Sequence, residues 1–212
     1  MRFALPFLAL ALLAAPAPAR PTLPRINAEE LALYLPDGAS VEVRLDADVT
    51  GDGIGDTVAV GQTEEERRLV VLAGYVEKVD RGHRPIGQMT LDLSPLGSAS
   101  LWMANGVLLV SDLTGGTTAV ASLYRFRHDR AADRMRLIGD DVELYSRTFA
   151  HDGLKISTNR LTGHQVRTAT KLTGRGAKAR YLPAPPQTRR VPRAPVFMEE
   201  APDPSETLGW GD

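Results

Sequence analysis

The chain of 212 residues contains no cysteine. It therefore has no disulfide framework, no thiol nucleophile and no cysteine that could carry a lipid. If such a chain is exported, its fold has to be stabilised by a hydrophobic core or by a bound metal ion.

The apolar run at the N-terminus, Phe3 to Ala15, is too short to span a membrane. It holds about 13 residues and is interrupted by Pro6, whereas a transmembrane helix needs about 20. It follows the single charge of Arg2 and precedes Ala17-Pro18-Ala19, a motif of small residues typical of a cleavage site. We expect residues 1–19 to be a signal peptide and the mature protein to be secreted or periplasmic, with no membrane span.

The chain also has almost no net charge, since 25 Lys and Arg residues face 26 Asp and Glu residues, which gives −1. A global field of this size attracts neither nucleic acid nor an anionic membrane. We therefore expect no nucleic-acid partner, and any binding of a polyanion would have to be local. The hydrophobic content of 43% is ordinary for a globular domain.

What is present is a pattern of short strands. The run Val41 to Leu45 alternates apolar and polar residues, as a half-buried strand does. Further runs of this kind are separated by turn sequences such as Asn105-Gly106 and Gly115-Gly116. The pattern predicts a mostly β fold of antiparallel hairpins in a meander, as a sandwich or a partial-propeller-like arrangement. One short N-terminal helix is expected where Asn27 can cap residues 28–31.

The composition changes after Leu182, where Pro183-Ala184-Pro185-Pro186 is followed by an arginine-rich stretch and an acidic end. A segment of this kind buries too little apolar surface to offset the entropy lost on ordering. We expect one β-rich domain over residues 20–182 and a Pro-rich disordered tail over residues 183–212.

The most informative stretch is residues 46–56, in which oxygen donors alternate around glycines. Hard cations prefer six or more oxygen ligands, and a calcium loop supplies them from alternate positions around a glycine. The predicted ligands at loop positions 1, 3, 5, 7 and 9 are Asp48, Thr50, Asp52, the Ile54 carbonyl and Asp56. The alternative is an Asx turn, in which the Asp side chains bond only their own backbone.

The pattern Asp48-x-Thr50-Gly51-Asp52-Gly53-x-x-Asp56, followed by Thr57-Val58-Ala59-Val60, resembles the calcium-loop core of FG-GAP or VCBS-type repeats. In that family the loop joins two strands of a propeller blade, and its carboxylates hold a structural ion. The resemblance implies calcium bound by Asp48, Thr50, Asp52 and Asp56. Since it covers about 15 residues and occurs once, while a propeller needs about four or more blades, it implies the loop without the propeller.

A second stretch, from Gly115 through Tyr124-Arg125-Phe126-Arg127 to Gly139, is similar to the β-rich half of secreted bacterial proteins that carry one such loop. This similarity implies one integrated domain and no activity. The hairpin from Arg125 to Arg136 concentrates arginines, and it would form either a guanidinium patch or a solvated face.

Enzymatic motifs are scarce. The four histidines have no metal-binding spacing, and Asp140 and Asp141 are expected in a turn between two strands. We expect a non-enzymatic, calcium-stabilised domain that recognises a protein or glycan partner outside the cytoplasm. The alternatives are a secreted hydrolase with an acidic cleft and a purely structural component of the envelope. A binding module should expose an aromatic or Arg patch, whereas a glycoside hydrolase should hold two carboxylates about 5 to 10 Å apart in a groove.

Overall fold

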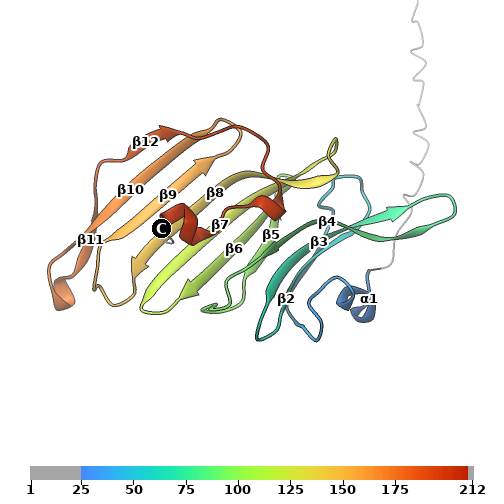
Figure 1. Ribbon diagram of the computed structural model, residues 1–212, viewed down its shortest axis with the longest axis horizontal. Coiled ribbons are helices and arrows are strands. Elements are labelled where there is room, and N and C mark those ends of the chain that lie inside the picture. Colours follow the sequence, from blue (N-terminus) through green and yellow to red (C-terminus); the bar gives the residue numbers. More distant parts are fainter. Residues whose placement is uncertain (1–24, 210–212) are drawn as a thin grey trace, which may run out of the picture.

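The computed structural model describes residues 25–209 (Figure 1). The predicted signal peptide, residues 1–19, lies outside this range. The described chain confirms the mostly β prediction, because it forms two antiparallel sheets with only short helices. The four-stranded sheet has the order β1 (Ser40–Ala47), β2 (Asp56–Gln62), β3 (Arg67–Val76) and β4 (Arg81–Thr90).

The eight-stranded sheet is a meander in which each strand from β5 to β11 pairs with its neighbour in the chain, and β12 pairs with β10 beside β11. Its strands are β5 (Ser100–Ala104), β6 (Val107–Gly115), β7 (Thr118–Asp129), β8 (Arg134–Ser146), β9 (Gly153–Asn159), β10 (His164–Thr173), β11 (Arg180–Pro183) and β12 (Gln187–Arg190). The turn at Asn105-Gly106 adopts positive φ at both residues, as the sequence predicts.

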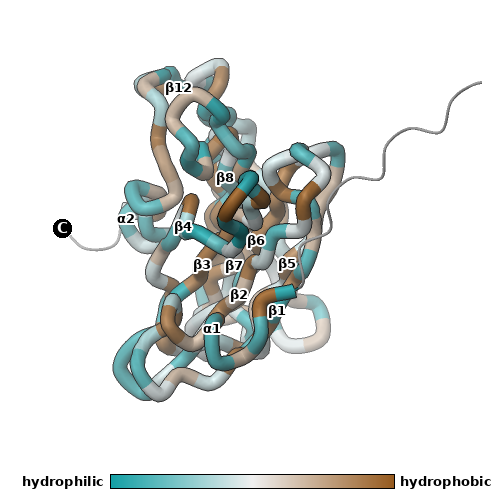
Figure 2. Tube along the Cα trace, turned by 90° about the vertical axis from the view of Figure 1, so that its right-hand side faces the viewer, coloured by the Kyte–Doolittle hydropathy of each residue, from teal (hydrophilic) through white to brown (hydrophobic). Residues whose placement is uncertain are grey.

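The two sheets enclose one hydrophobic core between the four-stranded sheet and strands β6 to β8. Figure 2 shows hydrophobic positions gathered along β2, β3, β6 and β7. The core includes Val58 and Leu69 from the smaller sheet and Phe126 and Leu137 from the larger one, all fully buried. Strands β9 to β12 extend beyond this sandwich, at the left of Figure 1.

Short helices cover two further surfaces. Helix α1 (Ala28–Ala32) is capped by Asn27, whose Oδ1 accepts the Glu30 N–H at 2.8 Å, and Leu31 packs against the outer face of β2 and β3. This second cover explains why β2 and β3 are buried on both faces. Helix α2 (Pro204–Leu208) places Leu208 on β7 to β9.

The prediction of a disordered tail is wrong for residues 187–208. Strand β12 pairs with β10, and the 3₁₀ helix η2 (Met198–Glu200) inserts Met198, which is 0% exposed, into the main core. Gly87 makes room for it, because a Cβ there would lie 3.0 Å from the Met198 sulfur. The average composition of the segment conceals three well-spaced apolar anchors, which are Val196, Met198 and Leu208.

Candidate functional site

The predicted calcium loop joins β1 to β2 and is held by its own backbone. The Asp48 carboxylate accepts the N–H groups of Gly51, Asp52 and Gly53 at 2.7, 3.1 and 2.9 Å. Gly51 and Gly53 have φ of +73° and +87°, which explains the glycines. The Thr50 hydroxyl lies 3.4 Å from Asp48 Oδ1, so the structure brings these two predicted ligands together.

Asp56 lies on the inner side of the loop and is 1% exposed. Its Oδ2 accepts the N–H groups of Val49 and Thr50 at 2.7 and 2.8 Å, and its Oδ1 accepts that of Gly74 in β3 at 2.9 Å. Burial raises the pKa of Asp56 above its ordinary value, although these three N–H groups oppose the shift and the charge of Asp52 adds to it. Asp56 thus connects the loop to the sheet from within.

The remaining predicted ligands are near the surface. Asp52 is exposed and its Oδ1 accepts the N–H of Ile54 at 2.7 Å. The carboxylates, the hydroxyl and the carbonyl are oxygen ligands of the kind that a hard cation prefers. Asp56, however, points inward to the N–H groups of the loop and β3, so it does not share a ligand set with Asp48, Thr50 and Asp52. Within residues 25–209, no group of three or more His, Cys, Asp or Glu side chains has the geometry to hold a metal ion.

The arginine hairpin of β7 and β8 is paired with acids. Arg125 contacts Asp141 at 2.6 Å, and Arg134 contacts Glu199 at 2.7 Å while it covers the ring of Phe197 at 4.0 Å. The predicted guanidinium patch is therefore largely neutralised by its neighbours. Tyr124 and Phe126 lie in the core, as the sequence indicates.

Asp140 and Asp141 lie inside β8 rather than in the expected turn. As consecutive strand residues, their side chains point to opposite faces of the sheet. Asp140 is buried and holds Arg160 through contacts of 2.6 and 3.1 Å, while Asp141 holds Arg125. The two carboxylates therefore cannot act on one substrate.

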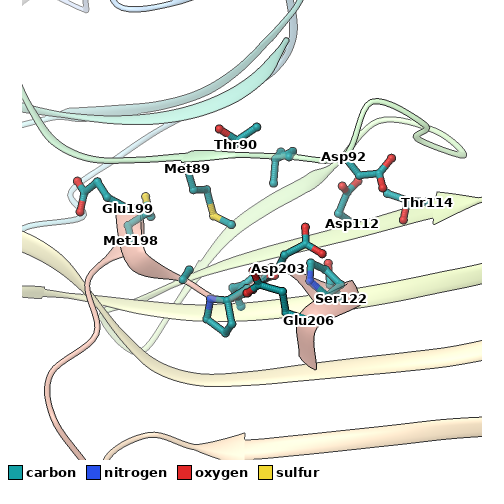
Figure 3. Close-up of a pocket in the computed structure, with 15 residues that line it drawn as sticks. Met89, Thr90, Asp92, Asp112, Thr114, Ser122, Met198, Glu199, Asp203 and Glu206 are labelled. Carbon is teal, nitrogen blue, oxygen red and sulfur yellow. Dashed lines mark hydrogen bonds between the residues drawn. The ribbon is translucent and has the colours of Figure 1, made fainter. Parts of the chain in front are cut away.

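An acidic groove that the sequence did not indicate lies between the sheets and the C-terminal segment (Figure 3). It has a volume of about 290 Å³ and carries Asp92, Asp112, Asp203 and Glu206. These residues come from the loop after β4, from β6 and from the start of α2 and its cap. Sequence reasoning missed the groove because its three segments are far apart in the chain.

Most of these carboxylates have structural partners. Asp112 binds Arg67, Asp203 caps α2 by accepting the Ser205 N–H at 2.7 Å, and Asp92 accepts the Ser94 N–H at 2.6 Å. A glycoside hydrolase needs one carboxyl group that donates a proton and a second that acts as base or nucleophile. The groove has room for such chemistry, whereas three of these four acids are engaged in holding the fold.

In a second hollow, which shares Asp92, Thr114 and Asp203 with the groove, a hydroxyl lies beside an imidazole. Thr118 Oγ1 is 2.8 Å from His151 Nε2, and His151 Nδ1 is 2.6 Å from the Asp152 carbonyl. The Asp152 carboxylate contacts Lys171 instead of the imidazole. The pair connects the start of β7 to the loop that follows β8.

Among the charged residues that the structure describes, Arg67 is the most deeply buried, with 0% exposure. Its guanidinium makes two contacts to Asp112, of 2.6 and 3.0 Å, and two to Glu42, of 2.7 and 2.9 Å. Burial raises the pKa of Glu42. Three effects together outweigh burial, namely the hydrogen bonds from Arg67, the hydrogen bond from the Ala99 N–H and the positive charge of the guanidinium, so the pKa lies below its ordinary value. The cluster joins β1, β3 and β6, and hence the two sheets.

The strongest charge asymmetry lies at the end of the larger sheet. Residues 147–193 contain eleven Lys and Arg residues and a single acid, Asp152, so the rest of the chain is strongly acidic. We call this region the cationic end. Its basic residues are Arg147, Lys155, Arg160, Arg167, Lys171, Arg175, Lys178, Arg180, Arg189, Arg190 and Arg193.

All of these basic residues except Arg160 are exposed. Within residues 25–209, only Lys155, Arg160 and Lys171 have a carboxylate within salt-bridge distance. The other eight therefore present uncompensated positive charge. Arg147 lies in the loop after β8, and the remaining seven lie on β10, β11 and β12 or in the segments that connect or follow them. A net charge near zero conceals this separation, which a count by segment would have revealed.

No family model, no curated protein and no solved structure matches this chain. In the part of the chain that the structure describes, no helix has the length and apolar character needed to cross a membrane.

Proposed function

We propose that this chain is an exported, non-enzymatic binding protein that recognises a partner outside the cytoplasm through its cationic end. The observation that supports this proposal is the local charge of the cationic end, where eight exposed Lys and Arg residues lack a carboxylate neighbour among residues 25–209. Fixed charges of one sign attract a partner of the opposite sign and orient it during encounter.

The comparison of the two basic regions supports this choice. In the β7–β8 hairpin, Arg125 and Arg134 have acidic partners, so their positive charges are largely cancelled and would attract an anionic partner only weakly. At the cationic end, Arg175, Lys178 and Arg180 lie around the β10–β11 connection and have no such partner among the described residues. An exposed basic patch is the feature expected of a binding module.

Replacing Arg175, Lys178 and Arg180 by glutamine should weaken binding to an immobilised sulfated polysaccharide. We expect about a tenfold loss of affinity at physiological salt, since each exposed charge pair contributes about 0.2 to 1 kcal/mol. The measurement is the dissociation constant from surface plasmon resonance at several salt concentrations, and the salt dependence should become shallower.

The matched control replaces Lys78, Arg81 and Arg127, which are exposed and lie outside the cationic end. It changes the net charge by the same amount, so it should leave the affinity within about twofold if position and not total charge governs binding. Equal losses in both triple variants, or no binding by the wild-type protein, would contradict the proposed site.

We also propose that calcium binding at Asp48, Thr50, Asp52 and the Ile54 carbonyl stabilises the fold, with Asp56 as the internal support of the loop. An ion that binds only the folded state adds about 2.7 kcal/mol at a hundredfold excess over its Kd. Sites in extracellular modules have a Kd of about 10⁻⁴ to 10⁻³ M, and the neutral hydroxyl of Thr50 favours the weak end.

Millimolar calcium should therefore raise the melting temperature, and Asp52→Ala should remove the rise. The control is Asp37→Ala, which changes an exposed acid in another connection. Differential scanning calorimetry with calcium and with chelator measures both. A wild-type melting curve that calcium leaves in place would show that the loop is a set of Asx turns alone.

A further inference from the structure

The cationic end contains a hollow of about 520 Å³ between β10, β12 and the connection that precedes β12. It is lined by small, polar and basic side chains and by no aromatic ring. The lining residues are Arg167, Ala169, Ala184, Pro185, Gln187, Thr188 and Arg189.

Arg189 is oriented by a buried amide. Its Nε donates to Gln165 Oε1, and Gln165 in turn donates from Nε2 to Thr158 Oγ1 at 2.9 Å. Gln165 is only 5% exposed, so this chain of hydrogen bonds is fixed within the sheet. Because Nε is occupied, the two terminal nitrogens of the guanidinium remain as a fork of donors at the hollow.

Arg167 lies on the same face of the sheet. In the antiparallel pairing of β10 with β12, Gln165 faces Arg189 and Arg167 faces Gln187, so the two arginines are diagonal neighbours. Diagonal positions of this kind are about 7 to 8 Å apart, within the reach of two long side chains. Neither arginine has a carboxylate partner among the described residues, so two like charges share one hollow without a counter-ion from the fold.

We infer that this hollow binds a sulfate, phosphate or carboxylate group of an anionic glycan, with Arg189 as the fork and Arg167 as the second cation. The inference rests on the proposed recognition through the cationic end and names its anchoring site. A planar guanidinium with a fixed Nε binds an oxyanion through two parallel hydrogen bonds. Gln187, which pairs with Arg167 on the same side of the sheet, adds an amide that suits the hydroxyls of a sugar chain.

The absence of aromatic rings in the lining favours a glycan over single-stranded nucleic acid. Proteins that bind single-stranded nucleic acid stack the bases on aromatic side chains. Between residues 147 and 193 the aromatic residues are Phe149 and Tyr181, and their rings stack on each other at 5.6 Å. They offer no stacking platform at the hollow.

The test uses the full mature chain and isothermal titration calorimetry with a heparin octasaccharide, an oligogalacturonate of equal length and a single-stranded oligonucleotide. Arg189→Gln should weaken binding of the octasaccharide about 10- to 100-fold, because charge-assisted hydrogen bonds are lost. Arg190→Gln is the comparison within the cationic end, because Arg190 faces His164 on the opposite side of the sheet. It should show only the smaller loss that diffuse charge produces, less than about threefold.

Gln165→Met tests the orientation of the fork separately. It keeps both arginines but removes the acceptor of Arg189 Nε–H, so it should weaken octasaccharide binding with an unchanged number of charges. The backbone amide spectrum of each variant should confirm an intact sheet. In the wild-type protein, the Arg189 Nε–H resonance should shift on titration with the octasaccharide.

The outcomes distinguish the two proposals. Equal losses in the Arg189 and Arg190 variants would overturn the anchoring site and leave recognition by diffuse charge in place. No binding of any of the three polymers would overturn the proposed function itself. An oligonucleotide that binds more tightly than both glycans, with the same dependence on Arg189, would replace the glycan with nucleic acid.

Discussion

Replacing Arg67 with methionine should lower the free energy of unfolding by about 3 to 5 kcal/mol, because removal of one partner leaves buried charges without compensation. Arg67 is fully buried between Glu42 and Asp112, whose side chains are 10% and 4% exposed. Methionine preserves much of the volume, so the loss would measure the unpaired carboxylates rather than a cavity. Urea unfolding followed by circular dichroism gives the value.

The adjacent Arg68 provides the control. It pairs with Glu66 at the surface, and Arg68→Met should cost less than about 1 kcal/mol. Comparable losses for the two variants would mean that the buried cluster contributes no more than an exposed pair.

The pH dependence gives an independent reading of the same cluster. The pKa of Glu42 is lowered in the folded state, so its contribution to stability is present above the ordinary value of 4.5 and is lost as the pH falls below it. In the Arg67→Met variant, only the Ala99 N–H would still lower the pKa of Glu42, and burial, the largest influence, would raise it above its ordinary value. The contribution of Glu42 to stability would then be lost as the pH rises instead of as it falls.

Replacing Met198 with alanine should lower the free energy of unfolding by about 2 to 4 kcal/mol, through lost burial and the cavity that remains. Met198 is 0% exposed and reaches the core between β4 and β8. The variant should also open the C-terminal segment, so that trypsin cleaves at Arg189-Arg190 faster than in the wild-type protein.

Glu199→Ala is the neighbouring control, because Glu199 is exposed and, among residues 25–209, pairs with Arg134 alone. It should change the free energy of unfolding by less than about 1 kcal/mol. If Met198→Ala has an equally small effect and trypsin removes the segment from the wild-type protein, the segment is undocked, as its composition predicts.

The sequence predicts the strands well because they alternate over long stretches, as Thr118 to Arg127 does within β7. It fails where one or two contacts decide the outcome. Met198 docks a segment rich in proline and charge, and no average over that segment detects a single anchor. Arg67 begins an apolar strand and gives no sign that it is buried, because its partners are 25 and 45 residues away.

The same distinction applies to the sites. The calcium loop is local, so its donors can be read from spacing, whereas the direction of Asp56 depends on Gly74 in another strand. The hollow at Arg189 depends on the pairing of β12 with β10, a contact that the predicted tail excluded. A count of charges over residues 147–193 would have identified the cationic end from the sequence, whereas the net charge of the whole chain gives no sign of it.

The division of the outermost edge into two strands affects how this protein behaves at high concentration. An open strand edge templates the addition of further strands and leads to aggregation. Here the edge of β10 is covered by β11 and β12, which have four residues each and are separated by Pro185 and Pro186. Prolines offer no N–H to an incoming strand, and Arg189 and Arg190 repel a second copy of the same edge. The arginines that would attract an anion thereby also keep the sheets of separate molecules apart.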